Sequence, residues 1–309
     1  MRIATFNVQN LRLRHPAGHA RLDGARDEDM PQDSGPHAAA LDLADRRLTA
    51  AVLAHAGADV VCLQEVFDLE SLDFFHDHLL RHVDDTSYPY RFCFPGNDGA
   101  GRNLALMSRR LVTEVISHAK LTPADLGLQV TQGILSKAPV FRRDCLMAQI
   151  GALTLFLCHL KAPWPDEKAA WSLRRLEALG IRRLIERRFG ASEDALWLVV
   201  GDLNEPREAV LEEQAIAPLL QDFSIDLMER VPVSDRWSHY DVSSGYSRPD
   251  SFLASPTLAK KWPDARPFAF REGSSREITR YTGPRLPDVG AHRPHASDHV
   301  PIVVEFAGL

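Results

Sequence analysis

The chain has 309 residues, of which 45% are hydrophobic and 25% are charged. These values are ordinary for a folded globular protein, so the composition excludes disordered, collagen-like and mucin-like chains. The 36 lysines and arginines against 42 aspartates and glutamates give a net charge of −6, which excludes a broadly basic coat for nucleic acid. Any binding of phosphate must therefore be local or assisted by a metal.

Short apolar runs that predict β-strands recur along the whole chain. Each run is bounded by polar or turn-forming residues, as strands are. In chain order the runs are residues 3–8, 60–63, 104–107, 145–150, 153–157, 196–200, 251–253 and 301–306. All of them are too short to cross a bilayer, so we expect no membrane span.

Helical periodicity appears between some of these runs. Apolar residues recur at helical spacing in residues 41–56 and again in residues 167–189, where the arginines are expected on the outer face. Residues 208–220 are a weaker candidate. Residues 15–37 are rich in Gly, Pro and Asp and have no apolar period, which predicts a long loop. No similar linker divides the rest, so residues 1–309 are expected to form one domain of the α/β or α+β class.

The cysteines and the N-terminus indicate in which cellular compartment the protein is expected. Three of the four cysteines, Cys62, Cys145 and Cys158, lie inside apolar runs, where cysteine usually acts as a small buried hydrophobe. The sequence contains no CxxC pair, so neither a zinc knuckle nor a redox motif is indicated. Met1 is not followed by a signal-peptide pattern. These features predict a cytoplasmic location.

Polar side chains lie at the ends of several of the apolar runs. The segments are Phe6-Asn7, Leu63-Gln64-Glu65, GDLN at residues 201–204 and SDH at residues 297–299. Loops that follow strands are where layered folds place catalytic groups. Carboxylate and amide oxygens are ligands that suit Mg²⁺, Mn²⁺ or Ca²⁺. Each segment taken alone is explained equally well as the cap of a strand or turn.

In this order, the segments resemble the endonuclease/exonuclease/phosphatase superfamily, which includes exonuclease III, deoxyribonuclease I, inositol polyphosphate 5-phosphatases and neutral sphingomyelinases. The resemblance spans Thr5 to Ile302 and rests on TFNVQNLR, DVVCLQEV, RNLALMSR, LFLCHLKAP, VVGDLNEP, RPDSFLAS and SDHVPI. GDLNEP and SDHVPI are its most specific parts. The resemblance implies a four-layer sandwich of two packed mixed β-sheets flanked by helices, with the site at one end.

The resemblance also implies a metal site. Glu65 matches the main metal-binding glutamate, Asn7 matches the asparagine beside it, and Asp298 matches an aspartate near the metal. The implied cofactor is Mg²⁺ or Mn²⁺, with Ca²⁺ able to replace either in crystals. A divalent cation offsets the negative charge of a phosphodiester, which otherwise repels an incoming hydroxide.

Five further residues match catalytic positions of the family. Asp202 and Asn204 match the pair that orients the attacking water and contacts the phosphate. His299 matches the histidine that hydrogen-bonds the phosphate, and Asp250 matches its orienting partner. His159 matches the strand-end histidine of the deoxyribonuclease I and phosphatase branches. A histidine paired with a carboxylate is favoured as imidazolium, which suits it to donate to phosphate.

One segment departs from the exonuclease III pattern. Residues 158–163 read CHLKAP where abasic-site nucleases of that type carry an Asn-x-Tyr-x-Pro-type segment. The His-Leu-Lys order resembles instead the branch in which histidine protonates the leaving oxygen. The departure argues against specific repair of abasic sites.

Several basic and amide residues are candidates for contacts with substrate. Arg102 and Asn103 follow a Gly-rich turn, and either phosphate binding or a plain hairpin explains them. Lys161 is expected either to reach substrate or to be solvated. Arg142 and Arg143 precede a strand and are expected at an exposed edge. We call Arg102, Arg142, Arg143 and Lys161 the basic strip.

These observations predict a divalent-metal-dependent phosphoesterase that uses an activated water and forms no covalent intermediate. The leading interpretation is a phosphodiesterase or nuclease that binds DNA or RNA through the basic strip. One alternative is a phosphatase or phosphodiesterase acting on a small phosphate ester or a phospholipid head group. A second alternative, from another class, is a non-catalytic binding module on the same scaffold. The complete set of matched residues argues against the binding module.

Overall fold

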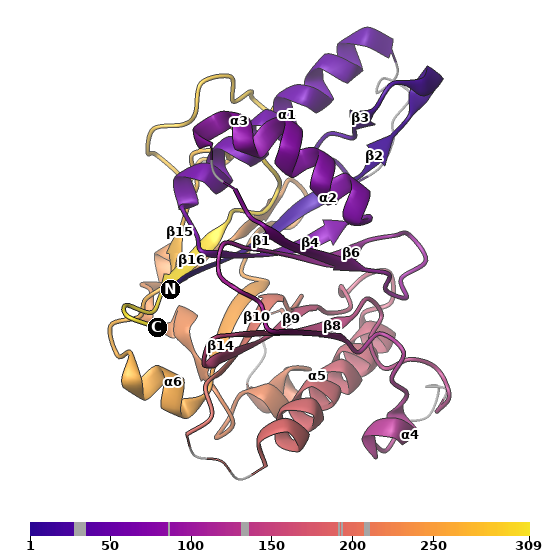
Figure 1. The fold of residues 1–309 in the computed structure, drawn as a ribbon, viewed down its shortest axis with the longest axis vertical. Helices are drawn as coiled ribbons and strands as arrows, with labels where there is room; N and C mark the ends of the chain where they lie inside the picture. Colours follow the sequence, from indigo (N-terminus) through magenta and orange to yellow (C-terminus); the bar gives the residue numbers. More distant parts are fainter. Residues whose placement is uncertain (28–34, 86, 131–135, 191, 193, 207–210) are drawn as a thin grey trace.

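The computed structural model describes all residues except 28–34, 86, 131–135, 191, 193 and 207–210. Figure 1 shows four layers, in which two stacked β-sheets lie between one layer of helices above and one below. Each large sheet has six strands. The predicted four-layer sandwich is confirmed.

The first sheet has the order β15-β16-β1-β4-β6-β5. Its strands are β1 (Arg2–Leu11), β4 (Val60–Val66), β5 (Tyr90–Phe94), β6 (Asn103–Ser108), β15 (Phe268–Ala269) and β16 (Ile302–Glu305). β1 and β4 run parallel, and the other neighbours pair antiparallel. The sheet is therefore mixed, and the carboxyl ends of β1 and β4 reach the same edge.

The second sheet has the order β11-β14-β10-β9-β8-β7. Its strands are β7 (Glu114–Ser117), β8 (Cys145–Ile150), β9 (Leu153–His159), β10 (Trp197–Asp202), β11 (Ile225–Asp226) and β14 (Asp250–Ala254). β9 and β10 run parallel, and β14 pairs antiparallel with β10. The carboxyl ends of β9 and β10 thus lie beside the start of β14.

Helices cover the outer faces of both sheets (Figure 1). The α-helices are α1 (Gly35–Ala56), α2 (Leu69–Phe75), α3 (Arg81–Asp84), α4 (Pro123–Leu126), α5 (Glu167–Phe189) and α6 (Pro256–Lys261). Two small hairpins add β2 (Leu13–Arg14) with β3 (Arg21–Leu22) and β12 (His239–Asp241) with β13 (Gly245–Ser247). Across the described residues, no helix is both long and apolar enough to span a membrane.

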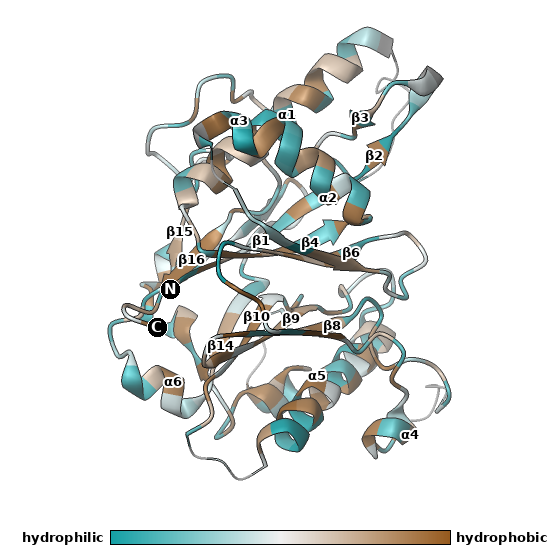
Figure 2. Cartoon of the chain, viewed as in Figure 1, coloured by the Kyte–Doolittle hydropathy of each residue, from teal (hydrophilic) through white to brown (hydrophobic). Residues whose placement is uncertain are grey.

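The core has three apolar layers, because strand side chains alternate between the two faces of a sheet. Between the sheets, residues such as Cys62 of β4 and Val200 of β10 belong to one buried cluster. The outer face of the first sheet packs on α1, and that of the second packs on α5. Figure 2 shows the strands of both sheets in the colours of hydrophobic residues.

Two predictions about local structure need correction. Residues 15–37 are not one irregular loop, since they include β3, a short 3-10 helix at Pro16–Gly18 and the start of α1; residues 28–34 lie outside the described part. Residues 208–210 of the predicted helix at 208–220 lie outside the described part, and residues 211–220 form two 3-10 turns, Leu211–Glu213 and Ala217–Leu219, instead of that helix. Pro218 lacks a backbone N–H and constrains the preceding residue, which opposes a regular helix there.

Candidate active site

The site forms where the ends of strands from both sheets meet. In the second sheet, Asp202 at the end of β10 is in register with His159 at the end of β9 and with Asp250 at the start of β14. In the first sheet, Asn7 of β1 is in register with Gln64 of β4, one residue before Glu65. The parallel direction of each strand pair therefore delivers these polar side chains to one end of the sandwich.

Asp202 is the centre of this arrangement. Its Oδ2 accepts a hydrogen bond from Asn7 Nδ2 at 3.1 Å and lies 3.3 Å from His159 Nε2 and 3.8 Å from His299 Nε2. Its Oδ1 accepts from the backbone N–H of Asn204 at 3.0 Å. The carboxylate is 2% exposed, and this burial raises its pKa. One buried carboxylate thus joins the two sheets and both histidines.

His299 and Asp250 form a buried pair, as predicted from the sequence. His299 Nδ1 lies 2.8 Å from Asp250 Oδ2, which also accepts from the Ser238 hydroxyl at 2.7 Å. Burial alone would lower the pKa of His299, but the charge and hydrogen bond of Asp250 outweigh it and hold that pKa well above its ordinary value. His299 is therefore an imidazolium with Nε2 directed to the centre of the site.

His159 has the opposite character. It is 2% exposed, and its Nδ1 has no hydrogen-bond partner among the described residues. Burial, followed by the nearby positive charge of Arg143, holds the pKa of His159 well below its ordinary value. His159 is neutral in the free protein, so it can act as a proton donor only if it gains a proton together with an anionic substrate.

The candidate metal residues lie around Glu65. Its Oε1 is 3.3 Å from Asn7 Nδ2, and its Oε2 accepts from the backbone N–H of Asn10 at 3.1 Å. Glu65 has a φ of 65°, and the register of β4 shifts on either side of it. Such a bulge re-aims a side chain that a regular strand would send elsewhere. The left-handed backbone thus points the Glu65 carboxylate into the site.

The donor set fits a hard divalent cation. The pKa of Glu65 is raised by its burial and by the negative charges of Asp27 and Asp298, although Arg102 opposes the shift. Oxygen ligands with excess negative charge are what Mg²⁺, Mn²⁺ and Ca²⁺ require. Asn7, Glu65 and Asp298 would hold the ion. His239, which the sequence analysis did not single out, lies with Asp298 and His299 in a group whose ligand atoms all fall within 4.8 Å.

The sequence matches the endonuclease/exonuclease/phosphatase family over residues 4–299. The chain belongs to this family. No curated protein matches the sequence.

Solved structures of this family share the fold. A family protein from Leptotrichia buccalis has a TM-score of 0.60 at 14% identity, covering 99% of this chain and 98% of that one. An AP endonuclease from Archaeoglobus fulgidus has a TM-score of 0.58 at 16% identity, covering 99% of each. A mannosyl-6-phosphatase from Bacteroides thetaiotaomicron has a TM-score of 0.55 at 15% identity, covering 99% and 98%. At these identities the likeness establishes the fold alone.

The predicted substrate residues differ in where they lie. Arg102 Nε donates to Asn10 Oδ1 at 2.8 Å and is 3.8 Å from Glu65 Oε2, so it borders the site. Asn103 is buried, and its amide binds the Phe67 carbonyl at 2.6 Å and the Gly96 N–H at 2.7 Å, which braces the Gly-rich turn. The ammonium of Lys161 binds carbonyls of its own loop, those of residues 162 and 164.

Two arginines expected at the surface are buried instead. Arg143 is 8% exposed and donates from Nη1 to the Leu160 carbonyl at 2.9 Å, while its Nε has no hydrogen-bond partner among the described residues. Arg174 of α5 is 1% exposed and lies 3.3 Å from Glu205. The expected exposed edge and outer helix face are therefore wrong for these two residues. In both cases tertiary contacts bring the guanidinium under a loop of the site.

A further buried charge on α5 holds two loops of the site together. The Glu177 carboxylate accepts from the backbone N–H of Arg142 at 2.9 Å and from that of Lys161 at 2.8 Å. Sequence reasoning missed Glu177 and Arg174. A usable signal existed, because residues 174, 177, 181 and 185 share helical spacing, which places the two charges on the apolar stripe.

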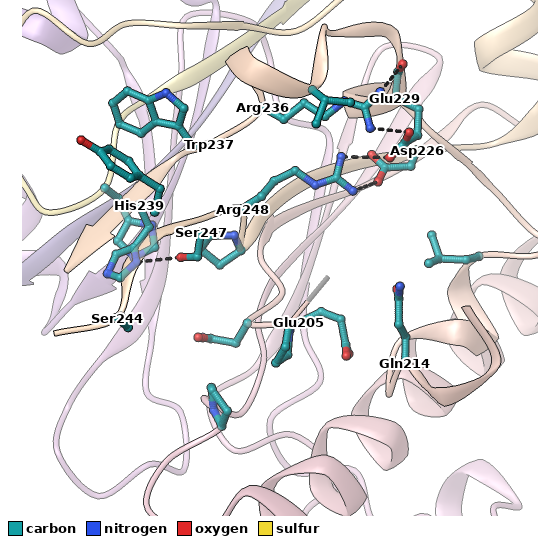
Figure 3. A pocket seen from close by; sticks show the side chains of 18 of the residues that line it. Glu205, Gln214, Asp226, Glu229, Arg236, Trp237, His239, Ser244, Ser247 and Arg248 are labelled. Carbon is teal, nitrogen blue, oxygen red and sulfur yellow. Dashed lines mark hydrogen bonds and ion pairs between the residues drawn. The ribbon is translucent and has the colours of Figure 1, made fainter. Parts of the chain in front are cut away.

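A pocket of about 840 Å³ opens beside His299 and Asn204. Figure 3 shows Arg248 reaching across it toward Asp226 and Glu229. The Arg248 guanidinium lies 3.0 Å from Asp226 Oδ2 and 3.1 Å from Glu229 Oε1. Three carboxylates and three arginines line the pocket, so the charges of these six groups cancel and the positive charge of His299 remains at its edge. We call it the side pocket.

Proposed function

We propose that this protein hydrolyses phosphate esters by metal-dependent attack of water on phosphorus. The observation that carries the proposal is the position of Asp202, whose Oδ2 lies between Asn7, His159 and His299. Phosphoester hydrolysis needs an acceptor for the proton of water and donors for the phosphate oxygens in one place. This end of the sandwich supplies both.

Each residue has a distinct part in the proposed reaction. A bound divalent cation would offset charge on the phosphate oxygens. Asp202 orients the attacking water and accepts its proton, because its raised pKa makes it a stronger base than an ordinary aspartate. The imidazolium of His299, held by Asp250, donates a hydrogen bond to a phosphate oxygen. Asn204 is fixed beside Asp202 by its backbone N–H; one hydrogen of its amide goes to the Leu160 carbonyl at 3.1 Å, and the other would make it the second donor.

The basic strip gives limited support to binding of a nucleic-acid duplex. Arg143 is buried, Lys161 binds carbonyls of its own loop, and Arg102 is engaged by Asn10 and lies near Glu65. Arg142 alone of the four is exposed. Binding of a polyanion grows with the number of phosphates that cations neutralise. We therefore place a small phosphate ester ahead of DNA or RNA as the substrate.

The side pocket supports this choice. It is lined by His299 and Asn204, the two proposed phosphate donors, so it is a cavity directly beside a phosphate held by those residues. Trp237 and Tyr246 line the pocket, and its two carboxylate-bound arginines, Arg236 and Arg248, are already paired. A compact leaving group without net charge suits these walls better than a strand of nucleic acid does.

A panel of substrates tests the proposal. The protein is assayed with Mg²⁺, with Mn²⁺ and with excess chelator on bis-(p-nitrophenyl) phosphate, sugar and inositol phosphates, sphingomyelin, supercoiled DNA and single-stranded RNA. We expect chelator-sensitive release of phosphate or alcohol from small esters, and loss of that activity in Asp202→Asn. Full activity in chelator would refute the proposal. Cleavage of DNA with a steep dependence on salt would favour the nuclease instead.

A further inference from the structure

Arg46 of α1 is a completely buried arginine whose donors all bind backbone carbonyls, most of them at one end of β1. Its side chain is 0% exposed. Nη1 and Nη2 donate to three consecutive carbonyls of β1 at 2.6, 2.7 and 3.0 Å, those of Val8, Gln9 and Asn10. Nε and Nη2 also donate at 2.6 and 2.8 Å to the carbonyls of Asp23 and Gly24. One guanidinium therefore ties β1 to the segment that follows β3.

The backbone to which Arg46 donates its hydrogen bonds is in an unusual conformation. Gln9 and Asn10 have φ values of 49° and 57°, and two successive left-handed residues without glycine are costly, at roughly 1–2 kcal/mol each. Three consecutive carbonyls turned toward one cation compensate for this cost. Without the guanidinium, those buried carbonyls would lack partners, and the end of β1 would be free to relax toward an extended strand.

The same two residues touch each candidate metal ligand. The backbone N–H of Gln9 donates to Asn7 Oδ1 at 3.0 Å, and that of Asn10 donates to Glu65 Oε2 at 3.1 Å. The Gln9 side-chain oxygen accepts from the backbone N–H of Asp298 at 3.2 Å. The contacts of Arg46 thus converge, through two residues, on Asn7, Glu65 and Asp298.

The carboxylates near Arg46 do not take its hydrogen bonds. Asp45 accepts from the backbone N–H of Ala25 and of His295, each at 3.0 Å, and pairs with Arg293. Asp42 pairs with Arg26 and Arg293. Their charges balance that of Arg46 from one side, which leaves its donors for the carbonyls of β1 and the following segment.

We propose that Arg46 is a positioning residue of the metal site, which sets the geometry of Asn7, Glu65 and Asp298 through the left-handed end of β1. The inference rests on the metal dependence in the proposed function. Groups that orient metal ligands from behind typically contribute 10-fold to 100-fold to metal affinity. Gln9 and Asn10 have that relation to the three ligands, and Arg46 holds the backbone of both.

Metal affinity, measured without substrate, tests this role. We would titrate Mn²⁺ into wild-type, Arg46→Lys and Arg46→Met proteins, following bound Mn²⁺ by electron paramagnetic resonance and the fold by circular dichroism. The matched control is Arg230→Met. Arg230 also gathers three carbonyls, those of Trp262, Ala265 and Ala259, but it does so beside α6.

We expect Arg46→Met to weaken Mn²⁺ binding at least tenfold. Arg46→Lys should weaken Mn²⁺ binding less, because an ammonium keeps the positive charge but not the planar set of donors of a guanidinium. Arg230→Met should lower the melting temperature without changing the affinity. Folded Arg46 variants that bind Mn²⁺ like the wild type would overturn the inference, and Arg46→Lys decides the matter if Arg46→Met does not fold. Wild-type protein that binds no Mn²⁺ would refute the proposed metal dependence, and the inference with it.

Discussion

Replacing Glu65 by glutamine separates the stability of the site from its affinity for metal. The two Glu65 oxygens accept hydrogen bonds from Asn7 and Asn10, and a glutamine keeps one acceptor while its NH₂ faces the other donor. That mismatch costs about 1–3 kcal/mol. The same change removes a carboxylate whose pKa is raised by burial and by the charges of Asp27 and Asp298, so its loss is stabilising. Because the two effects oppose each other, the free energy of unfolding without metal should change by less than about 2 kcal/mol.

Metal should then distinguish the two proteins clearly. At a Mg²⁺ concentration 100 times its dissociation constant, the wild type gains about 2.7 kcal/mol, which for a chain of this size raises Tm by roughly 5 °C. Glu65→Gln should gain almost nothing and should lose most of its hydrolysis. Thermal melts with MgCl₂ and with chelator measure both effects, and Glu305→Gln, at the exposed end of β16, is the control. An equal Mg²⁺ shift in Glu65→Gln and the wild type would refute the assignment of Glu65 as the main ligand.

Three other predictions concern the buried side chains of His159, Arg143 and His76. His159→Ala should slow hydrolysis of esters with poor leaving groups more than that of p-nitrophenyl esters; equal losses in kcat/KM would exclude proton donation. Arg143→Met should lower kcat/KM about tenfold or more, which is equivalent to about 1.4 kcal/mol. The control is Arg142→Met, at the exposed neighbouring residue, which should change kcat/KM less than twofold. Equal effects of the two variants would contradict a role for the buried Arg143 guanidinium. The Nε2 atom of His76 accepts a hydrogen bond from the backbone N–H of Tyr88 at 2.9 Å, and burial lowers the pKa of His76. The unfolded chain therefore binds a proton first as pH falls, so stability should drop below about pH 6.5 by up to about 1.4 kcal/mol per pH unit. Denaturant unfolding at pH 7.5 and 5.5 measures this drop, and His76→Gln should reduce it.

The fold could be predicted largely because the strands that build the core are apolar on both faces. Each of the eight predicted runs overlaps a strand, and none extends more than one residue beyond it, since both sheets are covered on each side. The edge strands β5 and β7 were missed. β7 is short and mostly exposed, which leaves little apolar signal, whereas β5 reads YRFCF and carries an apolar signal that was overlooked. Helix α5 was predicted to the residue from its apolar periodicity, and the structure shows Asp166 as the cap of its start and Gly190, with a φ of 58°, at its end.

The site could be predicted where a side chain follows a strand, and not where a helix supplies it. Asp202, Asp250 and His299 were identifiable from strand ends and from family motifs, and the structure brings them together. Arg46 was not, because an arginine in an amphipathic helix usually faces solvent. Arg174 was missed for the same reason, although its spacing places it on the apolar stripe of α5. Local periodicity does not show which loop covers either residue.

The site residues at the strand ends depend on the buried arginine that a helix supplies. Four of the seven described non-glycine residues with positive φ adjoin the site, namely Gln9, Asn10, Glu65 and Asn204. In a regular strand successive side chains point to opposite faces, so one strand end could offer a shared centre only every second residue. The left-handed turns remove that restriction at roughly 1–2 kcal/mol each. Such strain persists only where the surroundings over-determine it. For Gln9 and Asn10 the surroundings include the hydrogen bonds that Arg46 donates to their carbonyls and to that of Val8, so a charge buried under the first sheet supports the strand end on which the proposed chemistry depends.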